Sequence, residues 1–320
     1  MTAKYYNPYN NVGDDGRWLK AQFHCHNWRL PSTEEKEEGF ADILIEYKAA
    51  GYDLVMHSGQ QGWYDTSTAS AEVGVATVNG QEYIDYDGIL LVGSTSFFSG
   101  EPQTAVDACR AQGGFAIHCH PNQAPRYDAT GRQLHLSQDQ ARALRGLAGV
   151  EVFNGFFERR PSSAVSYGGG LATDYWDEML SKGHKLWGFG GDDSHFRSEI
   201  NVGWTYIFAR DTGLAAVKSA VSEGALYAST GLTLYDFFFD GKMLRVEADL
   251  AHRRTGDVRY QVIGPNGRLL HEQRGAMLEY PLPASDPDYV RVEACSADGA
   301  MLWSQPLLRE DIFGPESLEL

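Results

Sequence analysis

Short apolar runs alternate with longer segments of helical period from Arg17 to about Gly231. The apolar runs occupy residues 52–56, 88–92, 114–117, 149–153 and 185–189. Between them, apolar residues recur at helical spacing over residues 34–50, 103–112, 137–147, 173–182 and 212–223. Apolar runs bounded by turns are typical of buried strands, and the helical spacing is typical of amphipathic helices. The alternation predicts repeated strand-helix units that form a barrel-like α/β domain.

The alternation of strand-like and helical segments stops after Gly231. Strand-like segments at residues 235–239, 243–250, 258–263 and 289–295 follow one another closely, separated by Asp240-Gly241, by residues 265–267 and by Asp298-Gly299. Such turn sequences between short strands are typical of antiparallel sheets. We therefore predict two domains, an α/β domain over residues 1–232 and a small, sandwich-like all-β domain over residues 233–320.

The charge of the chain restricts its partners. Its 320 residues include 27 Lys and Arg against 43 Asp and Glu, which gives a formal net charge of −16. Because affinity for nucleic acids depends mainly on Lys and Arg, we expect no nucleic-acid partner. The same balance argues against an anionic membrane surface. A small-molecule substrate is the expectation that remains, and the oligomeric state is left open.

The sequence also bears on the compartment. Residues 1–11 lack the basic end and apolar run of a secretory signal, and no apolar stretch approaches the length of a membrane-spanning helix. Four Cys in a chain of this length do not make a disulfide scaffold. We therefore expect a cytoplasmic protein.

Histidines and carboxylates stand where predicted strands end. His24 and His26 follow the apolar Trp18-Leu19, and in a strand their alternate side chains would face one way and could grip one metal ion. Cys25 would point to the opposite side. Asp193 and His195 have the same spacing after the run at residues 185–189. In a barrel of strand-helix units the site forms at these carboxyl ends.

A third cluster, His118-Cys119-His120-Pro121-Asn122, ends the strand predicted at residues 114–117. His120 lies where strand becomes loop, which makes it the candidate ligand. His118 shares its face by the period of two, and we expect it to be the buried, structural histidine of the pair. The same period turns Cys119 away from the histidines. Three histidine-rich strand ends favour a metal site over coincidence.

Five short motifs follow in a fixed order. They are Phe23-His24-Cys25-His26, Gly80-Gln81-Glu82, Gly113-Gly114 with His120-Pro121-Asn122, Glu151-Val152-Phe153-Asn154 and Gly191-Asp192-Asp193-Ser194-His195. In this order they resemble the PHP (polymerase and histidinol phosphatase) superfamily of metal-dependent hydrolases. Gly203-Trp204-Thr205 and residues 224–231 are similar to its branch of carbamate and amide hydrolases. The resemblance covers about residues 17–231.

The resemblance implies a fold and a metal cluster. The fold would be a distorted (β/α)7 TIM-like barrel, with the cluster at the carboxyl ends of its strands. A first metal ion would be held by His24, His26, Glu82 and Asp193. Glu82 would bridge to a second ion bound by His120, and His195 would bind a third ion or act nearby as an acid. Imidazole and carboxylate ligands suit one to three divalent ions of zinc, manganese or iron.

The sequence departs from the family pattern at two places. Gly59-Gln60 stands where the family has Asp-His, and His57 could substitute for them. Asp87-Gly88 replaces the family's His before the run Ile89-Leu90-Leu91-Val92-Gly93. Asp87 is either an oxygen ligand or an exposed turn residue. The first metal position is therefore complete, the second uncertain and the third eroded.

The leading hypothesis is a metal-dependent hydrolase that uses a metal-bound hydroxide. It would cleave a phosphoester, or a carbamate, amide or ester, in a small molecule. The predicted catalytic residues are His195, His57 and Asp193, with a histidine supplying the proton of the leaving group.

Three further residues are candidates for substrate binding. Arg126 and Arg197 lie close in sequence to the predicted site and could bind an anionic group. Asn154 is expected at the rim of the site.

Two alternative functions remain, a binding or regulatory module that kept the PHP fold after its cluster eroded, and a metal-assisted lyase.

Overall fold

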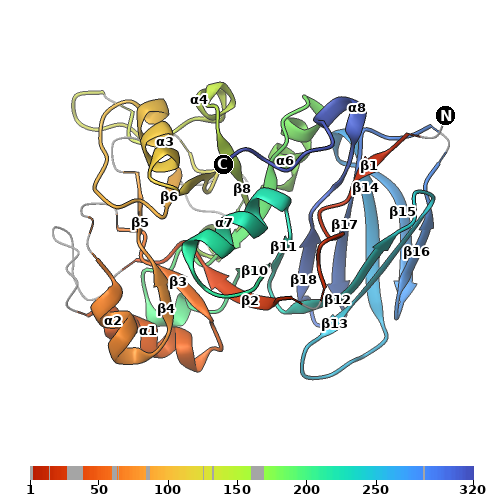
Figure 1. Cartoon of the computed structure of the whole chain (residues 1–320), viewed down its shortest axis with the longest axis horizontal. Helices are drawn as coiled ribbons and strands as arrows, with labels where there is room; N and C mark the ends of the chain where they lie inside the picture. Colours follow the sequence, from red (N-terminus) through yellow and green to blue (C-terminus); the bar gives the residue numbers. More distant parts are fainter. Residues whose placement is uncertain are drawn as a thin grey trace.

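The computed structural model describes residues 3–13, 15–26, 39–59, 63, 65–83, 87–124, 126–131, 133–159, 169–283 and 285–320. In this part of the chain, strands account for 37% of residues and helices for 23%. The described strands form three sheets. Figure 1 shows helices α1 to α4 at one end of the molecule and strands β12 to β16 at the other.

The largest sheet joins strands from both halves of the sequence. Its path is β1-β19-β17-β18-β11-β10-β2-β3-β4, and β14 and β15 extend it beside β17. In path order the strands are β1 (Tyr5–Tyr6), β19 (Leu307–Arg309), β17 (Tyr289–Ser296), β18 (Met301–Ser304), β11 (Leu226–Ser229), β10 (Trp204–Ala209), β2 (Arg17–Gln22), β3 (Leu54–Met56) and β4 (Ala76–Val78), followed by β14 (Val258–Gly264) and β15 (Arg268–Gly275).

Two smaller sheets complete the fold. The five-stranded sheet runs β5 (Gly80–Glu82), β6 (Ile89–Val92), β7 (Phe115–His118), β8 (Leu147–Asn154) and β9 (Trp187–Gly191). The three-stranded sheet runs β12 (Leu232–Phe239), β13 (Met243–Leu250) and β16 (Leu278–Pro281). β6 and β8 are buried along their whole length, as expected for strands with protein on both faces.

The helices are short. They are α1 (Phe40–Ala49), α2 (Ser67–Val73), α3 (Pro102–Ala111), α4 (Gln138–Ala143), α5 (Gly155–Glu158), α6 (Thr173–Ser181), α7 (Leu214–Glu223) and α8 (Glu310–Phe313), with 3-10 turns η1 (Arg197–Glu199) and η2 (Pro265–Gly267). α1, α3, α6 and α7 confirm predicted helices, although residues 34–38 of the first prediction lie outside the described residues. α4 is shorter than predicted, because Leu144 is already extended.

The predicted (β/α)7 barrel is wrong. Among the described residues no sheet closes on itself, and β4 and β5 belong to different sheets, as do β9 and β10. A TIM-like barrel needs parallel strands that are each followed by a helix. Here β5 pairs antiparallel with β6, and β10 pairs antiparallel with both β2 and β11. Only β2-β3-β4 and β7-β8-β9 are parallel.

The predicted boundary after residue 232 falls at the first residue of β12, and one sheet joins the parts on its two sides. β18 pairs with β11, with Ala228 opposite Trp303. β1, at the beginning of the described chain, pairs with β19. The C-terminal segment returns to the first half, where the amide of Leu318 donates to the carbonyl of Ser222 (Figure 1). The two halves are therefore joined by backbone hydrogen bonds as well as by packing.

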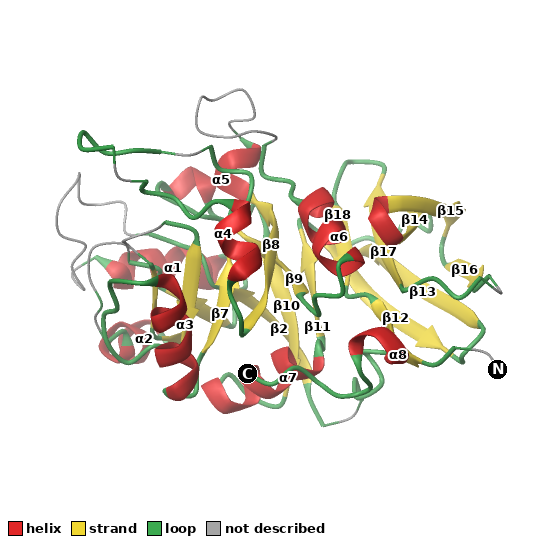
Figure 2. Ribbon diagram, turned by 90° about the horizontal axis from the view of Figure 1, so that it is seen from above, coloured by secondary structure: helices red, strands yellow, loops and turns green. Residues whose placement is uncertain are grey.

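A buried ion pair also joins the halves. Arg291 on β17 donates from Nε and Nη2 to the two carboxylate oxygens of Asp177 on α6, at 2.8 and 2.6 Å. Tyr289 donates to the same carboxylate at 2.8 Å. Figure 2 shows α6 beside the strands of the second half.

None of the described helices combines the length and apolar composition needed to span a membrane.

Candidate metal centre

The segment after β2 presents its two histidines to the same cluster. The amide of His26 donates to the carbonyl of Ser194, and the amide of Asp193 donates to the carbonyl of His24, both at 2.9 Å. This ladder holds residues 24–26 beside residues 193–194 in an extended conformation. The rings of His24 and His26 lie 5.3 Å apart between centroids. The predicted alternation therefore places both imidazoles together.

His24 is oriented by one carboxylate and faces two others. Its Nδ1 lies 3.1 Å from Oε1 of Glu151, so Nδ1 donates to that carboxylate, and in the neutral imidazole the lone pair is on Nε2. Nε2 lies 3.2 Å from Oδ1 of Asp193 and 3.5 Å from Oε2 of Glu82. At these distances Nε2 still makes no hydrogen bond with the described residues. A fully buried nitrogen without a hydrogen bond is suited to bind a cation.

His26, Glu82 and Asp193 complete the first group. Nε2 of His26 lies 3.2 Å from Oε2 of Glu82 and 3.1 Å from Oδ1 of Asp193. Glu82 ends β5 and is 1% exposed, and Asp193 is 3% exposed. The ligand atoms of His24, His26 and Asp193 all lie within 4.8 Å of one another. The structure thus brings together the four residues predicted for the first metal position.

His120 joins the cluster through a backbone turn. Its φ is 30°, in the left-handed region, so its side chain leaves the alternation of β7. Nε2 lies 2.9 Å from Oε1 of Glu82 and 3.6 Å from Oδ1 of Asp87. His118 stays in register and packs edge-on against Tyr175 of α6, 5.3 Å between centroids. Burial lowers the pKa of His118. The residue is fully buried in the core, as expected.

Asp87 belongs to the cluster. It is only 7% exposed, so the interpretation as an exposed turn residue is wrong. Its Oδ2 accepts from Arg126 at 2.5 Å and from Gln123 at 3.2 Å. Its Oδ1 has no hydrogen-bond partner among the described residues. Burial, with the charge of Glu82, raises the pKa of Asp87 to about 8.

The other charges of the centre depend on one another. Burial opposes protonation of His24, yet the carboxylates of Asp193, Glu151 and Glu82 raise its pKa well above the usual value. Burial would raise the pKa of Asp193, but the neighbouring His24 and His26 hold it far below its usual range. Buried carboxylates are stable only when paired or bound to a cation. The residues present therefore fit a divalent cation, which would take the place of protons on the histidines.

Glu151 and Asn154 support the ligands from β8. Oε2 of Glu151 accepts from the amide of His120 at 2.9 Å and from Nδ2 of Asn154 at 2.8 Å. Asn154 also donates to Oδ2 of Asp193 at 3.2 Å and is 1% exposed. Asn154 therefore lies inside the centre and not at its rim. A Cβ at Gly191 would stand 2.3 Å from Oε1 of Glu151, so this glycine makes room for the carboxylate.

The two adjacent aspartates have different roles. Asp193 has a φ of 51° and points into the cluster. Asp192 points to the opposite side, where it accepts from the amides of Asn201, Val202 and Gly203 at 2.7 to 3.0 Å. Burial raises the pKa of Asp192 to about 6 although these amides favour its charged form. Asp192 therefore fixes the loop before β10.

His195 lies at the open side of the centre, with 37% of its side chain exposed. Its Nδ1 lies 3.0 Å from the carbonyl oxygen of Asp193, and since a carbonyl only accepts, Nδ1 carries the proton. Its ring is tilted against those of His26 and Phe156, with centroids 4.4 and 4.8 Å away. Burial and the neighbouring His26 lower the pKa of His195.

A pocket of about 100 Å³ opens onto the cluster. Its lining consists of Glu82, Asp87, His120, Gln123, Arg126, Phe156, Phe157, Asp193 and His195. Arg126 is thus brought to the pocket, as predicted, with its side chain 47% exposed. Arg197 is not, since it is 74% exposed and pairs with Glu46 of α1.

His57 stands apart from the two groups of close ligand atoms. It is 3% exposed, and its ring packs edge-on against Phe40 of α1 at 5.0 Å. Of the pair Gly59-Gln60, Gln60 lies outside the described residues.

Sequence reasoning missed three residues of the centre. Cys119, expected to point away, has its Sγ 3.5 Å from Nε2 of His120, because the turn at His120 breaks the alternation. Glu151 was recognised only as part of a motif, although a buried Glu on an apolar strand was a usable signal. His135 donates from Nδ1 to the carbonyl of Asp87 at 2.7 Å, and its ring lies 5.7 Å from that of His120. No sequence signal pointed to His135.

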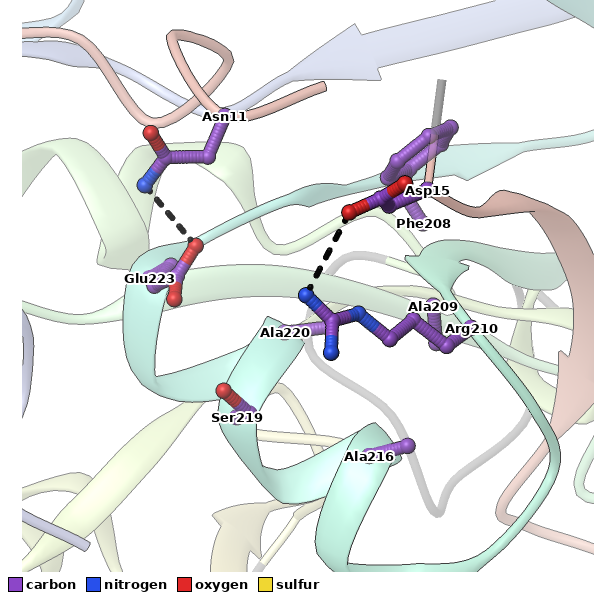
Figure 3. A pocket seen from close by; sticks show the side chains of 9 residues that line it. All are labelled: Asn11, Asp15, Phe208, Ala209, Arg210, Ala216, Ser219, Ala220 and Glu223. Carbon is purple, nitrogen blue, oxygen red and sulfur yellow. Dashed lines mark hydrogen bonds and ion pairs between the residues drawn. The ribbon is translucent and has the colours of Figure 1, made fainter. Parts of the chain in front are cut away.

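A larger cavity, of about 580 Å³, lies elsewhere on the molecule (Figure 3). It is bordered by α7 and the end of β10, and Arg210 pairs there with Asp15 at 3.6 Å. Asn11 donates to Glu223 at 3.1 Å across the same opening. None of the predicted site residues lines this cavity. The chemistry-bearing residues are gathered at the smaller pocket.

The comparisons with known proteins do not assign a family. No family model matches the chain, and no curated protein matches it. Among solved structures, PsfC from Pseudomonas syringae PB-5123 is 12% identical with a TM-score of 0.40, over 65% of this chain and 88% of PsfC. Native alpha-2-macroglobulin from Escherichia coli, spanning domains NIE-MG1, is 7% identical with a TM-score of 0.22, over 35% and 53%. At these scores neither likeness bears on fold or function.

Proposed function

We propose that the protein is a metal-dependent hydrolase of a small molecule, as the resemblance to the PHP superfamily implies. The observation that carries this proposal is the convergence of His24, His26 and His120 on the carboxylates of Glu82 and Asp193. All five residues are nearly inaccessible to solvent. The lone pair on Nε2 of His24, which makes no hydrogen bond with the described residues, points to a cation in their midst.

Two cations would be held by residues on either side of Glu82. Nε2 of His24 and Nε2 of His26 face Oε2 of Glu82, and Nε2 of His120 faces Oε1. Asp193 would complete the first position, because its Oδ1 lies beside both of those histidines. Zinc, manganese or iron suits imidazole and carboxylate ligands. When bound, a divalent cation polarises a substrate oxygen and lowers the pKa of a water molecule. A third position has no support beyond His195.

His195 is the residue placed to move a proton. Its Nδ1 proton is held by the carbonyl of Asp193, so Nε2 is the nitrogen that accepts or releases a proton. Its partial exposure at the pocket gives a substrate access to this ring. His195 would therefore take the proton of an attacking water or return one to the leaving group.

The pocket limits the reacting group. A volume of about 100 Å³ accommodates a small group and not a polymer segment. Arg126 adds a positive charge at the wall, although Asp87 already accepts one of its hydrogen bonds. An anionic or strongly polarised group fits these neighbours. The scissile bond would then be a phosphoester, or a carbamate, amide or ester.

The proposal is tested by metal content and turnover. The purified chain is loaded with zinc, manganese or iron, its bound metal is counted, and hydrolysis of chromogenic phosphomonoesters, esters and amides is measured. The double variant His24→Ala, Asp193→Ala should lose both metal and turnover, and Glu82→Gln should lose turnover. The matched control is His252→Ala, an exposed histidine far along the sequence, which should change neither.

Absence of bound metal in the wild-type chain would refute the proposal. Tight binding of a substrate without turnover in any metal would favour the binding module instead. A product without oxygen from labelled water would favour the lyase, because hydrolysis must incorporate that oxygen.

A further inference from the structure

Cys119 lies among potential metal-ligating atoms but has not been assigned to either cation position. Its Sγ is 3.5 Å from Nε2 of His120 and 3.9 Å from Oε1 of Glu82. The ligand atoms of His24, Glu82, Cys119 and His120 all lie within 4.8 Å of one another. The thiol is fully buried. This arrangement is absent at Cys25, whose thiol donates to the carbonyl of Met56 at 3.1 Å.

The separation between Cys119 and His120 matches that of two ligands in a tetrahedral metal site. With metal–sulfur and metal–nitrogen bonds of about 2.3 and 2.1 Å, two ligands of one tetrahedral zinc ion stand roughly 3.6 Å apart. The separation between Sγ and Nε2 of His120 is 3.5 Å. Nε2 of His24, which is buried and without a hydrogen bond in the described chain, lies within reach of the same atoms. The buried Nε2 of His24 is therefore a second atom, besides the sulfur, that is suited to bind a cation at this place.

We infer that Cys119 is a metal ligand, so that the second cation position is a thiolate site formed with His120 and Glu82. This inference rests on the proposed function, because both use the same centre. Asp87 stands beside it, with Oδ1 3.6 Å from Nε2 of His120 and no hydrogen-bond partner in the described chain. Coordination releases the thiol proton to solvent.

The consequence is a difference in metal preference within one centre. Thiolate is a soft ligand that selects zinc and disfavours manganese, whereas carboxylate and imidazole accept either. The position at His26 and Asp193 contains only nitrogen and oxygen ligands. The position at Cys119 would therefore retain zinc when manganese replaces the other ion.

Cobalt(II) in place of zinc tests the assignment without reference to activity. A thiolate bound to cobalt gives a charge-transfer band in the near ultraviolet, which nitrogen and oxygen ligands do not give. Full-length wild type, Cys119→Ser and Cys25→Ser are loaded with cobalt, and their spectra and cobalt contents are compared. Cys25→Ser is the matched control, since Cys25 is an equally buried thiol that flanks two metal ligands.

The charge-transfer band is expected in the wild type and in Cys25→Ser. Cys119→Ser should lose the band and should bind one cobalt ion fewer than the wild type. Cys119→Asp should restore the second ion and shift its preference toward manganese. A wild type that binds cobalt without the band, or a Cys119→Ser variant that keeps it, would overturn this inference and leave the hydrolase standing. A wild type that binds no metal would overturn both.

Discussion

Glu151 controls which nitrogen of His24 can bind a cation, and Glu151→Gln tests this control. Oε2 of Glu151 accepts from two donors, the amide of His120 and Nδ2 of Asn154. A glutamine must keep its oxygen at that position, so its amide nitrogen would face Nδ1 of His24. Nδ1 must then accept a hydrogen bond, which moves the imidazole proton to Nε2. The lone pair that faces Asp193 and Glu82 is lost.

The expected cost follows from the role of a residue that orients a ligand. Removing such a partner typically weakens metal binding by about 10- to 100-fold. This loss corresponds to about 1.4 to 2.7 kcal/mol of binding free energy at about 1.4 kcal/mol per tenfold change. Glu151 is expected at the upper end, because it also holds the backbone of His120 at 2.9 Å.

Zinc affinity is measured by competition with a chromogenic chelator at fixed pH. Glu178→Gln on α6 serves as the control, because this carboxylate is exposed and forms ion pairs with Arg142 and Lys182 on the surface. Urea unfolding of the metal-free proteins separates a loss of affinity from a loss of fold. If Glu151→Gln binds zinc as tightly as the wild type, the tautomer argument is refuted.

Three further predictions follow from the structure. Gly191→Ala would place its Cβ 2.3 Å from Oε1 of Glu151, so zinc affinity should fall about as far as in Glu151→Gln, whereas Gly13→Ala, with open space around it, should bind normally in the same competition assay. Arg291→Leu leaves the carboxylate of Asp177 buried without its bidentate partner and should lower the free energy of unfolding by about 3–5 kcal/mol in urea titrations. The double variant Asp177→Leu, Arg291→Leu should lose less than Arg291→Leu alone, and an equal or larger loss would contradict this account. Burial lowers the pKa of Lys20 from 10.5 to about 8. The unfolded chain then binds more protons than the folded chain between about pH 8 and 10.5, so stability should rise with pH over that window. Lys20→Met should show a smaller rise in pH-dependent urea unfolding, and an unchanged slope would rule out Lys20 as its source.

Local patterns in the sequence identified most of the candidate ligands. His24, His26 and Asp193 lie together in the structure. Their proximity was predictable, because an extended chain sends alternate side chains to one side and glycines mark where strands end. Charge excess and apolar periodicity likewise depend only on the order of residues. These features need no knowledge of the partners that lie far along the chain.

Long-range pairing decided the architecture. The order of strands and helices suggested a parallel barrel, but the sequence does not state which edges pair. β9 connects to β10 through a 3-10 turn and loops, and β10 then pairs antiparallel with β2 and β11. A strand that runs parallel to the one before it needs a long crossover connection, usually a helix. In the described chain no α-helix crosses over between β9 and β10, so the parallel arrangement ends at β9.

Tertiary structure alone also decided the composition of the centre. A single left-handed φ at His120 reversed the alternation, bringing Cys119 beside the ligands while His118 stayed in the core. Asp87 precedes β6 and Glu151 lies on β8, and the sheet that contains both strands brings the two carboxylates to one buried space. The sequence thus determined which ligand types stand at strand ends. Which of them share one cation depends on backbone turns and strand pairings that residue order does not encode locally.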